Sequence, residues 1–433
     1  PTGASVSHAR RRELSAWFTY TLARLEVGPH VIAELKKRRP QLLQARSIVL
    51  ISFGKAAHQM ATAALTALDG LVVRGLCVPP ELFAAPLPPL EVIAGGHPLP
   101  TLGSQRAAVR ALELCRTADP RDVILCLVSG GGSAILELPA DPNVSIDELR
   151  TFQQALVGCG APITQINTIR KHLSAVKGGH LAAAAAHCAQ IITLMISDVP
   201  DDQLSMIASG PTAPESSTLA DCRALLIQYG LVASLPPALR QRLEAGNLPP
   251  PIGAAHPVFT RSEPVVLLGN KNARHWLRMA ATARGIHVID DAIDDQPFVH
   301  TADHLLARLR QLKRNNKRGP VALLNGGEVT VSLPATQGLG GRNQQFALLC
   351  ALRIDGEPIT ILSAGTDGID GNSPAAGAVA DGDTVARAKA CGLDARQQLR
   401  QFDSFPLFRA LEDAIVTGPS GTNVRDLRLL IHE

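Results

Sequence analysis

Four segments of the chain share one pattern, a short and almost unbroken apolar run that ends in a glycine or polar turn and continues at helical spacing. They are SIVLISFGKAA (47–57), DVILCLVSGGGSAIL (122–136), QIITLMISDVPDD (190–202) and PVVLLGNKNARHWLRMAATARGI (264–286). A strand with one wet face would alternate polar and apolar residues, so unbroken runs indicate strands covered on both faces. The pattern predicts a doubly wound, Rossmann-like α/β domain with a mostly parallel sheet and ligands beyond the carboxyl ends of its strands.

The length of 433 residues predicts two domains, because single hydrophobic cores stop growing at roughly 250 to 300 residues. A stretch rich in Pro and Gly at 235–260 suits a connector, so we expect a large domain over 1–250 and a connector with a smaller α/β domain over 251–433. The later part has two further apolar runs, at 320–333 and 358–371, and a helix that begins near Gly341. We expect the active site in the cleft between the domains.

Composition and charge exclude several classes of protein. The net charge of +4 comes from interspersed basic and acidic residues, without the basic stripe and interleaved aromatics of a nucleic-acid-binding protein. The eight cysteines lie singly, without metal-ligand spacing, which is typical of reduced thiols in the cytosol. No apolar run is long enough for a signal peptide or a membrane span. We therefore expect a cytoplasmic protein with small-molecule partners, and a homo-oligomer is compatible with the sequence.

The turn after the second apolar run combines three glycines with two hydroxyls. Backbone N–H groups can close on a ligand where Cβ is missing, and hydroxyls can donate to phosphate oxygens. The residues are Ser129, Gly130, Gly131, Gly132 and Ser133. The turn matches neither the Walker pattern nor GxGxxG, and GGGSA is not the GxSxG elbow of a serine hydrolase. We expect an anion-binding turn, with a merely tight strand-to-helix turn as the alternative.

Cationic side chains follow other strand ends. Lys55 comes just after the first apolar run, where an ammonium group and a helix N-terminus together favour a phosphate or carboxylate. The segment INTIRKHLSAVKGG adds polar and basic candidates for cofactor binding, namely Asn167, Arg170, Lys171 and Lys177. A solvated helix face is the alternative explanation of this segment. His97 and His172 could act as acid or base, although a lone histidine is more often a structural hydrogen-bonder.

Acidic residues at strand ends predict a magnesium site. Asp198 follows the third apolar run, and helix capping is the competing role for an Asp there. In the later part, Asp367 and Asp370 lie in GTDGIDG, without the remaining ligands of an EF-hand. We expect Mg²⁺ at these three residues.

Polar groups in the later part complete the expected phosphate site. Glu328 follows a glycine pair, and Arg342 and Asn343 begin a helix in GGRNQQ. An arginine at such a position can clamp phosphate with two N–H groups and stabilise the transferring charge.

Ten motifs, in order along the chain, resemble the glycerate 2-kinase family, also called class II or MOFRL-type glycerate kinases. They are GKAA, GGHPLP, VSGGGSAILELP, INTIRKHLSAVKGG, SDVPDD, ASGPT, NGGEVTV, GGRNQQ, GTDGIDG and TGPSGTNVRDL. The resemblance runs from about residue 10 to the C-terminus. It implies ATP- and Mg²⁺-dependent phosphorylation of D-glycerate to 2-phosphoglycerate, with Lys55 and Arg342 carried over as catalytic and an Asp, Asp198 or Asp367, as metal ligand or proton acceptor.

Three positions depart from the family pattern. Where relatives read SDVPGD, GGRNQE and GGETTV, this chain has Asp201, Gln345 and Val329. The first change adds charge to a turn expected to bind metal.

Two rival functions stay open. A hydroxypyruvate reductase, a name that members of the family have carried, would need a nicotinamide site with a glycine fingerprint and a following acidic residue, which the sequence lacks. A non-catalytic protein that binds hydroxy acids is the other.

Overall fold

The computed structural model describes residues 3–81, 86–291, 295–316, 318–334 and 338–433, with side chains from residue 8 onward. The chain forms two compact units. The first unit is Val27–Leu267, and the second unit joins Pro1–Glu26 to Leu268–Glu433.

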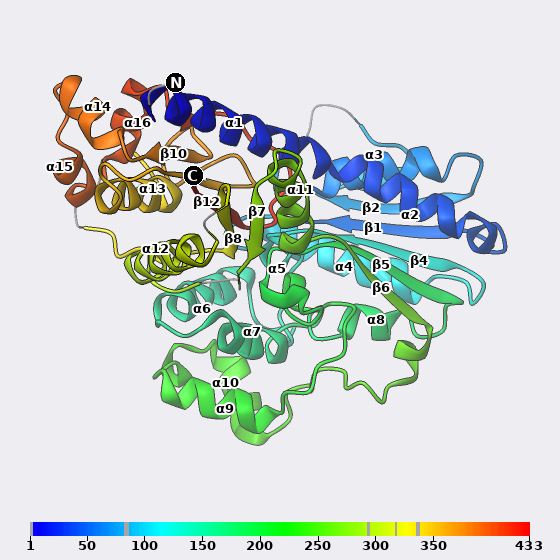
Figure 1. Cartoon of the computed structure of the whole chain (residues 1–433). Coiled ribbons are helices and arrows are strands. Elements are labelled where there is room, and N and C mark those ends of the chain that lie inside the picture. Colours follow the sequence, from blue (N-terminus) through cyan, green and yellow to red (C-terminus); the bar gives the residue numbers. More distant parts are fainter. Residues whose placement is uncertain (1–2, 82–85, 292–294, 317, 335–337) are drawn as a thin grey trace. The chain divides into compact units, whose positions relative to one another are not determined.

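The first unit is built on a six-stranded sheet (Figure 1). Its strands are β1 (Ile48–Phe53), β2 (Val73–Val78), β3 (Leu90–Val92), β4 (Val123–Val128), β5 (Gln190–Ile196) and β6 (Ser262–Leu268). Their order is β3-β2-β1-β4-β5-β6, and the pairs from β3 through β5 are parallel. Every residue of β1 and β4 is buried, as the unbroken apolar runs predict.

Helices cover both faces of this sheet. α3 packs on β1, β2 and β4 and against α2, whereas α4 packs on β1 and β2 and against α8. A separate apolar core joins α6, α7, α9 and α10. The helices are α2 (Val27–Leu42), α3 (Ala57–Ala67), α4 (Leu102–Arg116), α5 (Gly132–Ile135), α6 (Ile146–Gly158), α7 (Ile163–His172), α8 (His180–Ala184), α9 (Leu219–Gln228) and α10 (Pro237–Ala245).

The second unit contains a mixed six-stranded sheet in the order β11-β10-β9-β12-β8-β7. The β7–β8 pair is parallel, and the other pairs are antiparallel. The strands are β7 (His287–Asp290), β8 (Val321–Gly327), β9 (Ile359–Gly365), β10 (Gly377–Asp381), β11 (Ala414–Ile415) and β12 (Asp426–His432). The C-terminal strand β12 thus lies between β8 and β9 in the middle of the sheet.

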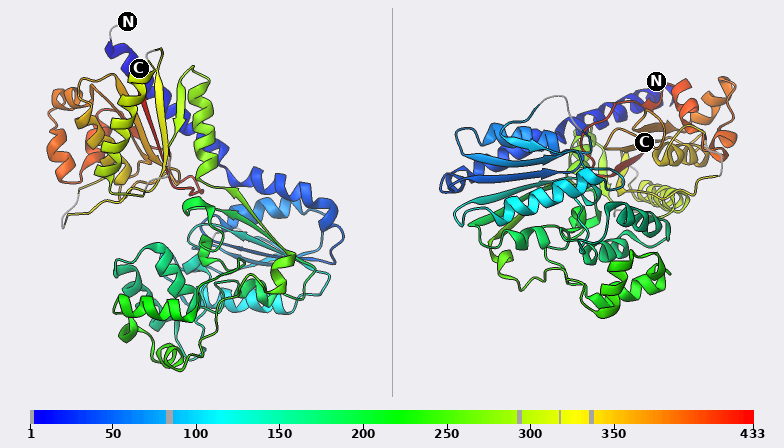
Figure 2. Two further views of the ribbon diagram at one scale, coloured as in Figure 1. Left: turned by 60° about the horizontal axis from the view of Figure 1, so that its bottom comes forward. Right: turned by 180° about the vertical axis from the view of Figure 1, so that it is seen from behind.

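Two pairs of helices pack on this second sheet (Figure 2). α12 and α13 contact each other and the sheet, and so do α1 and α11. The helices are α1 (Gly3–Arg24), α11 (Asn270–Thr282), α12 (Phe298–Asn315), α13 (Arg342–Arg353), α14 (Thr384–Ala390), α15 (Ala395–Arg400) and α16 (Ser404–Ala410).

The predicted fold class is confirmed. One α/β unit has a mostly parallel sheet, and the other α/β unit has a mixed sheet. The units differ from the expected division at 250/251, because β6 neighbours β5 in the first sheet and α1 packs on α11, β9 and β10 of the second unit. The order of the first sheet is the one found in dinucleotide-binding folds, which bind ligands where the strand order reverses. That point lies between β1 and β4.

Candidate functional site

The glycine-rich turn lies at this point of reversal, directly after β4. Backbone bonds join it to the end of β1: the Ser129 N–H donates to Phe53 O at 3.2 Å, and the Lys55 N–H donates to Gly130 O at 2.9 Å. The Ser129 hydroxyl also accepts the Ala56 N–H at 3.0 Å. The predicted anion-binding turn and the predicted catalytic lysine therefore lie side by side.

Each glycine of the turn has a different neighbour that an added Cβ would crowd. A Cβ on Gly130 would lie 2.5 Å from Asp198 Oδ2, and one on Gly131 would lie 2.7 Å from His97 Cδ2. A Cβ on Gly132 would lie 2.7 Å from that of Ala208. Gly131 also has a φ of 78°, in the region that favours glycine. The triple glycine is thus explained by close packing of the turn against three other segments.

Lys55 is exposed beside this turn, and its ammonium group has no hydrogen-bond or ion-pair partner within the described ranges. Its Cγ approaches Gly131, next to His97. Desolvation and the positive charge of Lys55 lower the pKa of His97, so this imidazole is neutral at pH 7. His172 is instead buried, with its Nε2 3.2 Å from the Ser217 hydroxyl.

A cavity of about 230 Å³, the first cavity, opens at the turn. Its wall includes predicted residues from three segments, namely Gly131, Ser133, Asn167, Arg170 and Asp198. The Ser133 hydroxyl lies 2.8 Å from the Ser209 hydroxyl, which donates to Asn167 Oδ1 at 3.1 Å. A polar chain thus connects the turn to α7.

The segment behind the first cavity has an unusual backbone. Ala208 and Ser209 have φ of 50° and 60°, and Asp201 and Asp202 have φ of 54° and 52°. Non-glycine residues in the left-handed region cost of order 1–3 kcal/mol each and cluster at functional sites. Asp is one of the non-glycine residues most tolerant of this region, which explains how Asp201 replaces the glycine of the family pattern.

The two predicted lysines of the basic run are ion-paired inside the first unit. Lys177 pairs with Glu137, and both side chains are buried. Lys171 pairs with Glu215. Their contact with a cofactor stays a prediction.

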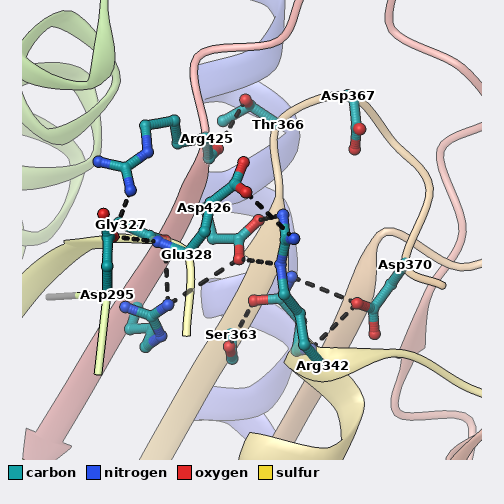
Figure 3. Close-up of polar contacts among 12 residues, drawn as sticks. Asp295, Gly327, Glu328, Arg342, Ser363, Thr366, Asp367, Asp370, Arg425 and Asp426 are labelled. Atoms are coloured by element: carbon teal, nitrogen blue, oxygen red, sulfur yellow. Dashed lines mark hydrogen bonds and ion pairs between the residues drawn. The ribbon is translucent and has the colours of Figure 1, made fainter. Parts of the chain in front are cut away.

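A second cluster of polar residues surrounds Arg342 in the second unit (Figure 3). The Arg342 Nε donates to Asp426 Oδ2 at 2.7 Å, and its Nη2 donates to Asp426 Oδ1 at 3.1 Å. Its Nη1 lies 3.2 Å from Glu328 Oε2. Burial lowers the pKa of Arg342, but these carboxylates outweigh burial and raise it above its usual value. The guanidinium is therefore permanently charged and fixed in orientation.

Asp370 caps the N-terminus of α13. Its carboxylate accepts the backbone N–H groups of Asn343 at 3.0 Å and Gln344 at 2.9 Å, and the Gln344 side-chain amide at 3.0 Å. Burial raises the pKa of Asp370 to about 6, against the hydrogen bonds from α13, which lower it. The Asn343 amide oxygen accepts the Ser363 hydroxyl at 2.8 Å. Asp370 and Ser363 thus both hold the start of α13 in place.

A second cavity, of about 440 Å³, opens beside Arg342. Asp367 and Asp370 line it together with apolar side chains, among them Leu333, Ile369 and Phe402. The predicted residues Arg342, Asp367 and Asp370 are thus brought together. Within the described ranges, no group of three or more His, Cys, Asp and Glu is arranged to hold a metal ion.

Sequence reasoning missed the partners of these residues. Asp426 lies in TGPSGTNVRDL, but nothing in its local pattern links it to Arg342, which lies 84 positions earlier. The role of Glu137 as the partner of Lys177 has no local signal, because a single acidic residue after an apolar run is usually a surface residue. His97 was weighed only as a lone histidine.

Comparison with known proteins identifies the family of the chain. Residues 13–244 match the family model described as "Domain of unknown function (DUF4147)", and residues 321–426 match the MOFRL family. A protein of Agrobacterium vitis with the provisional name hydroxypyruvate reductase is 39% identical over 88% of this chain and 98% of its own length. The D-glycerate 2-kinase of Thermotoga maritima is 35% identical over 91% of this chain and 92% of its own.

The solved structures agree as well. The crystal structure of a glycerate kinase from Thermotoga maritima superimposes with a TM-score of 0.87 at 30% identity, over 98% of this chain and 100% of that one. Among the described helices, none combines the length and apolar character needed to cross a bilayer. The chain, with a DUF4147 domain followed by a MOFRL domain, belongs to the glycerate 2-kinase family.

Proposed function

We propose that the chain is an ATP-dependent glycerate 2-kinase, which transfers the γ-phosphoryl group of ATP to the 2-hydroxyl of D-glycerate and releases ADP. The observation that carries the proposal is the glycine turn at the reversal of strand order, with the ammonium group of Lys55 beside it, which no described residue pairs. Backbone N–H groups at a strand end, together with a free cation, suit the oxygens of a phosphoryl group.

The reaction forms a bond between the 2-oxygen of glycerate and the γ-phosphorus, and it breaks the bond from that phosphorus to the bridging oxygen of ADP. Such a transfer needs positioning and charge neutralisation more than covalent help. Lys55 and Arg342 neutralise charge on the phosphoryl group. Asp198, at the wall of the first cavity, accepts the proton of the 2-hydroxyl.

Mg²⁺ fits the acidic residues of the second unit. A Cβ on Gly365 would lie 3.1 Å from Asp367 Oδ1 and 3.2 Å from Asp426 Oδ1, so both carboxylates face the bare α-carbon. Mg²⁺ is usually held by one or two carboxylates with phosphate oxygens and water. Asp367, whose Oδ1 also accepts the Ile369 N–H at 3.2 Å, would hold it, with Asp198 as the second candidate. The oxygens of Asp370 accept the N–H groups of α13. When bound, the ion neutralises charge on the phosphates.

The test compares ADP formation by the wild type and two variants with D-glycerate, ATP and Mg²⁺. Lys55→Ala removes an exposed group without a partner, so the protein should fold normally while kcat falls roughly 10²- to 10³-fold. Arg342→Lys keeps a charge beside Asp426 but loses the fork geometry, and it should also lower kcat. Lys37→Ala, at another exposed lysine of the first unit, should leave the rate unchanged. Unaltered kcat in the Lys55 and Arg342 variants would refute these roles.

Hydroxypyruvate reduction is the alternative that the name of the Agrobacterium vitis relative raises. The turn after β1, SFGKAAHQM, lacks the GxGxxG spacing that brings a dinucleotide pyrophosphate close to the backbone. The strand order of the first sheet does not by itself supply a dinucleotide-binding site. Phosphoryl transfer is therefore the better-supported function.

A further inference from the structure

Arg170 on α7 is a partly buried cation. It lines the first cavity, and its guanidinium makes no hydrogen bond or ion pair within the part of the chain that is described. Its Nε is fully buried and without a hydrogen-bond acceptor. Burial lowers the pKa of Arg170, and the negative charge of Glu137 opposes this.

Glu137, the acid whose charge raises the pKa of Arg170, has other partners. Its Oε1 accepts the Ser174 hydroxyl at 2.7 Å, its Oε2 accepts the Gln153 amide at 2.9 Å, and its charge is balanced by Lys177. Arg428, which is also buried, donates to the Asn325 side chain and to two backbone carbonyl groups. Leaving a buried charge unpaired is strongly unfavourable. Arg170 therefore fits a site whose missing partner is an anion supplied by a ligand.

The size and the lining of the first cavity indicate which kind of anion binds Arg170. Its volume of about 230 Å³ lies below the roughly 300–1,000 Å³ of pockets for drug-sized ligands, so it suits a three-carbon acid. Arg170 is a cationic group in its wall, and Asp198 is an acidic one. Ser133 and Asn167 add groups that can bond hydroxyls. This set matches a small hydroxy acid, with its carboxylate at Arg170 and its reacting hydroxyl at Asp198.

We infer that Arg170 binds the carboxylate of the acceptor acid, so that the first cavity is the acceptor subsite. The identity of the acid as glycerate rests on the proposed function. The inference that Arg170 binds an anion does not depend on the proposed function.

Steady-state kinetics of Arg170→Gln, with varied D-glycerate and varied ATP, test the inference. The KM for glycerate should rise roughly 10- to 100-fold, because a charge-assisted bidentate contact is lost, while the KM for ATP stays within about twofold. Arg170→Lys should fall between the wild type and Arg170→Gln. The melting temperature of Arg170→Gln should not fall, since the substitution removes an unpaired buried charge. Arg106→Gln, at an exposed arginine of α4, is the control and should match the wild type.

Opposite results overturn the inference. If Arg170→Gln raised the KM for ATP and left that for glycerate unchanged, Arg170 would serve a nucleotide phosphate. If neither KM moved, the cavity would not be the acceptor subsite.

Ligand-induced shifts in melting temperature separate this inference from the proposed function. D-glycerate should stabilise the wild type but not Arg170→Gln, and glycerol, which lacks the carboxylate, should stabilise neither. If the wild type formed no ADP but showed this Arg170-dependent shift, the kinase proposal would fail and the carboxylate site would stand. If D-glycerate stabilised both proteins equally, the carboxylate site would be refuted.

Discussion

Gly131 meets two demands at once, a positive φ and the absence of a Cβ. Its φ of 78° would strain any other residue, and an added Cβ would lie 2.7 Å from His97 Cδ2. Gly160 meets only the first demand, because its φ is 80° but nothing lies within 4 Å of an added Cβ. The chain thus offers a matched pair of glycines that separates backbone strain from crowding at the candidate site.

We predict that Gly131→Ala destabilises the protein more than Gly160→Ala does. Gly160→Ala should cost about 1 to 2 kcal/mol for the left-handed backbone alone. Gly131→Ala should cost about 1 to 3 kcal/mol more because of the overpacking against His97, and it should lower kcat/KM. Urea unfolding and steady-state assays of both variants measure this. Equal losses of stability with equal activity would mean that the turn adapts freely.

Single residues were predictable where their local pattern carries chemistry. Lys55 and Arg342 were singled out from a strand end and a helix entry, and the structure brings each beside other candidates. Asp426 could not be linked to Arg342 in the same way, because a partner 84 positions away leaves no local trace. The unpaired state of Arg170 likewise depends on Glu137 being occupied by other groups.

The buried pair of Lys177 and Glu137 connects several elements of the first unit. Glu137 follows α5, accepts from Gln153 on α6 and from Ser174 just after α7, and pairs with Lys177 in the turn before α8. Pro139 and Ser174 also form a β-bridge. The pair therefore links α6, the end of α7 and the turn before α8.

Breaking this pair should be far more costly than breaking an exposed one. Lys177→Met leaves Glu137 as an uncompensated buried charge, and we expect a loss of about 3 to 5 kcal/mol in the free energy of unfolding. Arg150→Met removes the exposed partner of Asp147 and should change it by less than about 1 kcal/mol. Denaturant titration of both variants measures the difference. Similar values for the two would show that Lys177 is not needed for the packing of these elements.

The elements themselves differ in how far the sequence predicts them. The β1, β4 and β5 runs are apolar and end in distinct turns, so each strand and its turn could be recognised locally. β1 and β4 lead into α3 and α5, whereas β5 leads into 3-10 turns. The place of β12 could not, because its insertion between β8 and β9 depends on pairing with strands far away in the sequence. The assignment of α1 to the second unit has the same origin, since it packs on α11 and β9.

At the scale of the whole molecule, each of the two α/β units contains one cluster of candidate residues. The first unit has the glycine turn, Lys55 and the first cavity, and the second has Arg342 with its acids. A shared role in one reaction, in the expected cleft between domains, stays a prediction from the sequence. Each cluster, taken by itself, combines a cation with carboxylates, which suits phosphoryl transfer.

The most direct test of the central claim is identification of the product formed by the wild type from D-glycerate, ATP and Mg²⁺. We predict one ADP for each glycerate consumed, and a product that enolase converts at once because it is 2-phosphoglycerate. Under the same conditions, hydroxypyruvate with NADH should show no loss of reduced cofactor. Oxidation of NADH by hydroxypyruvate, without ADP formation from glycerate, would contradict the account.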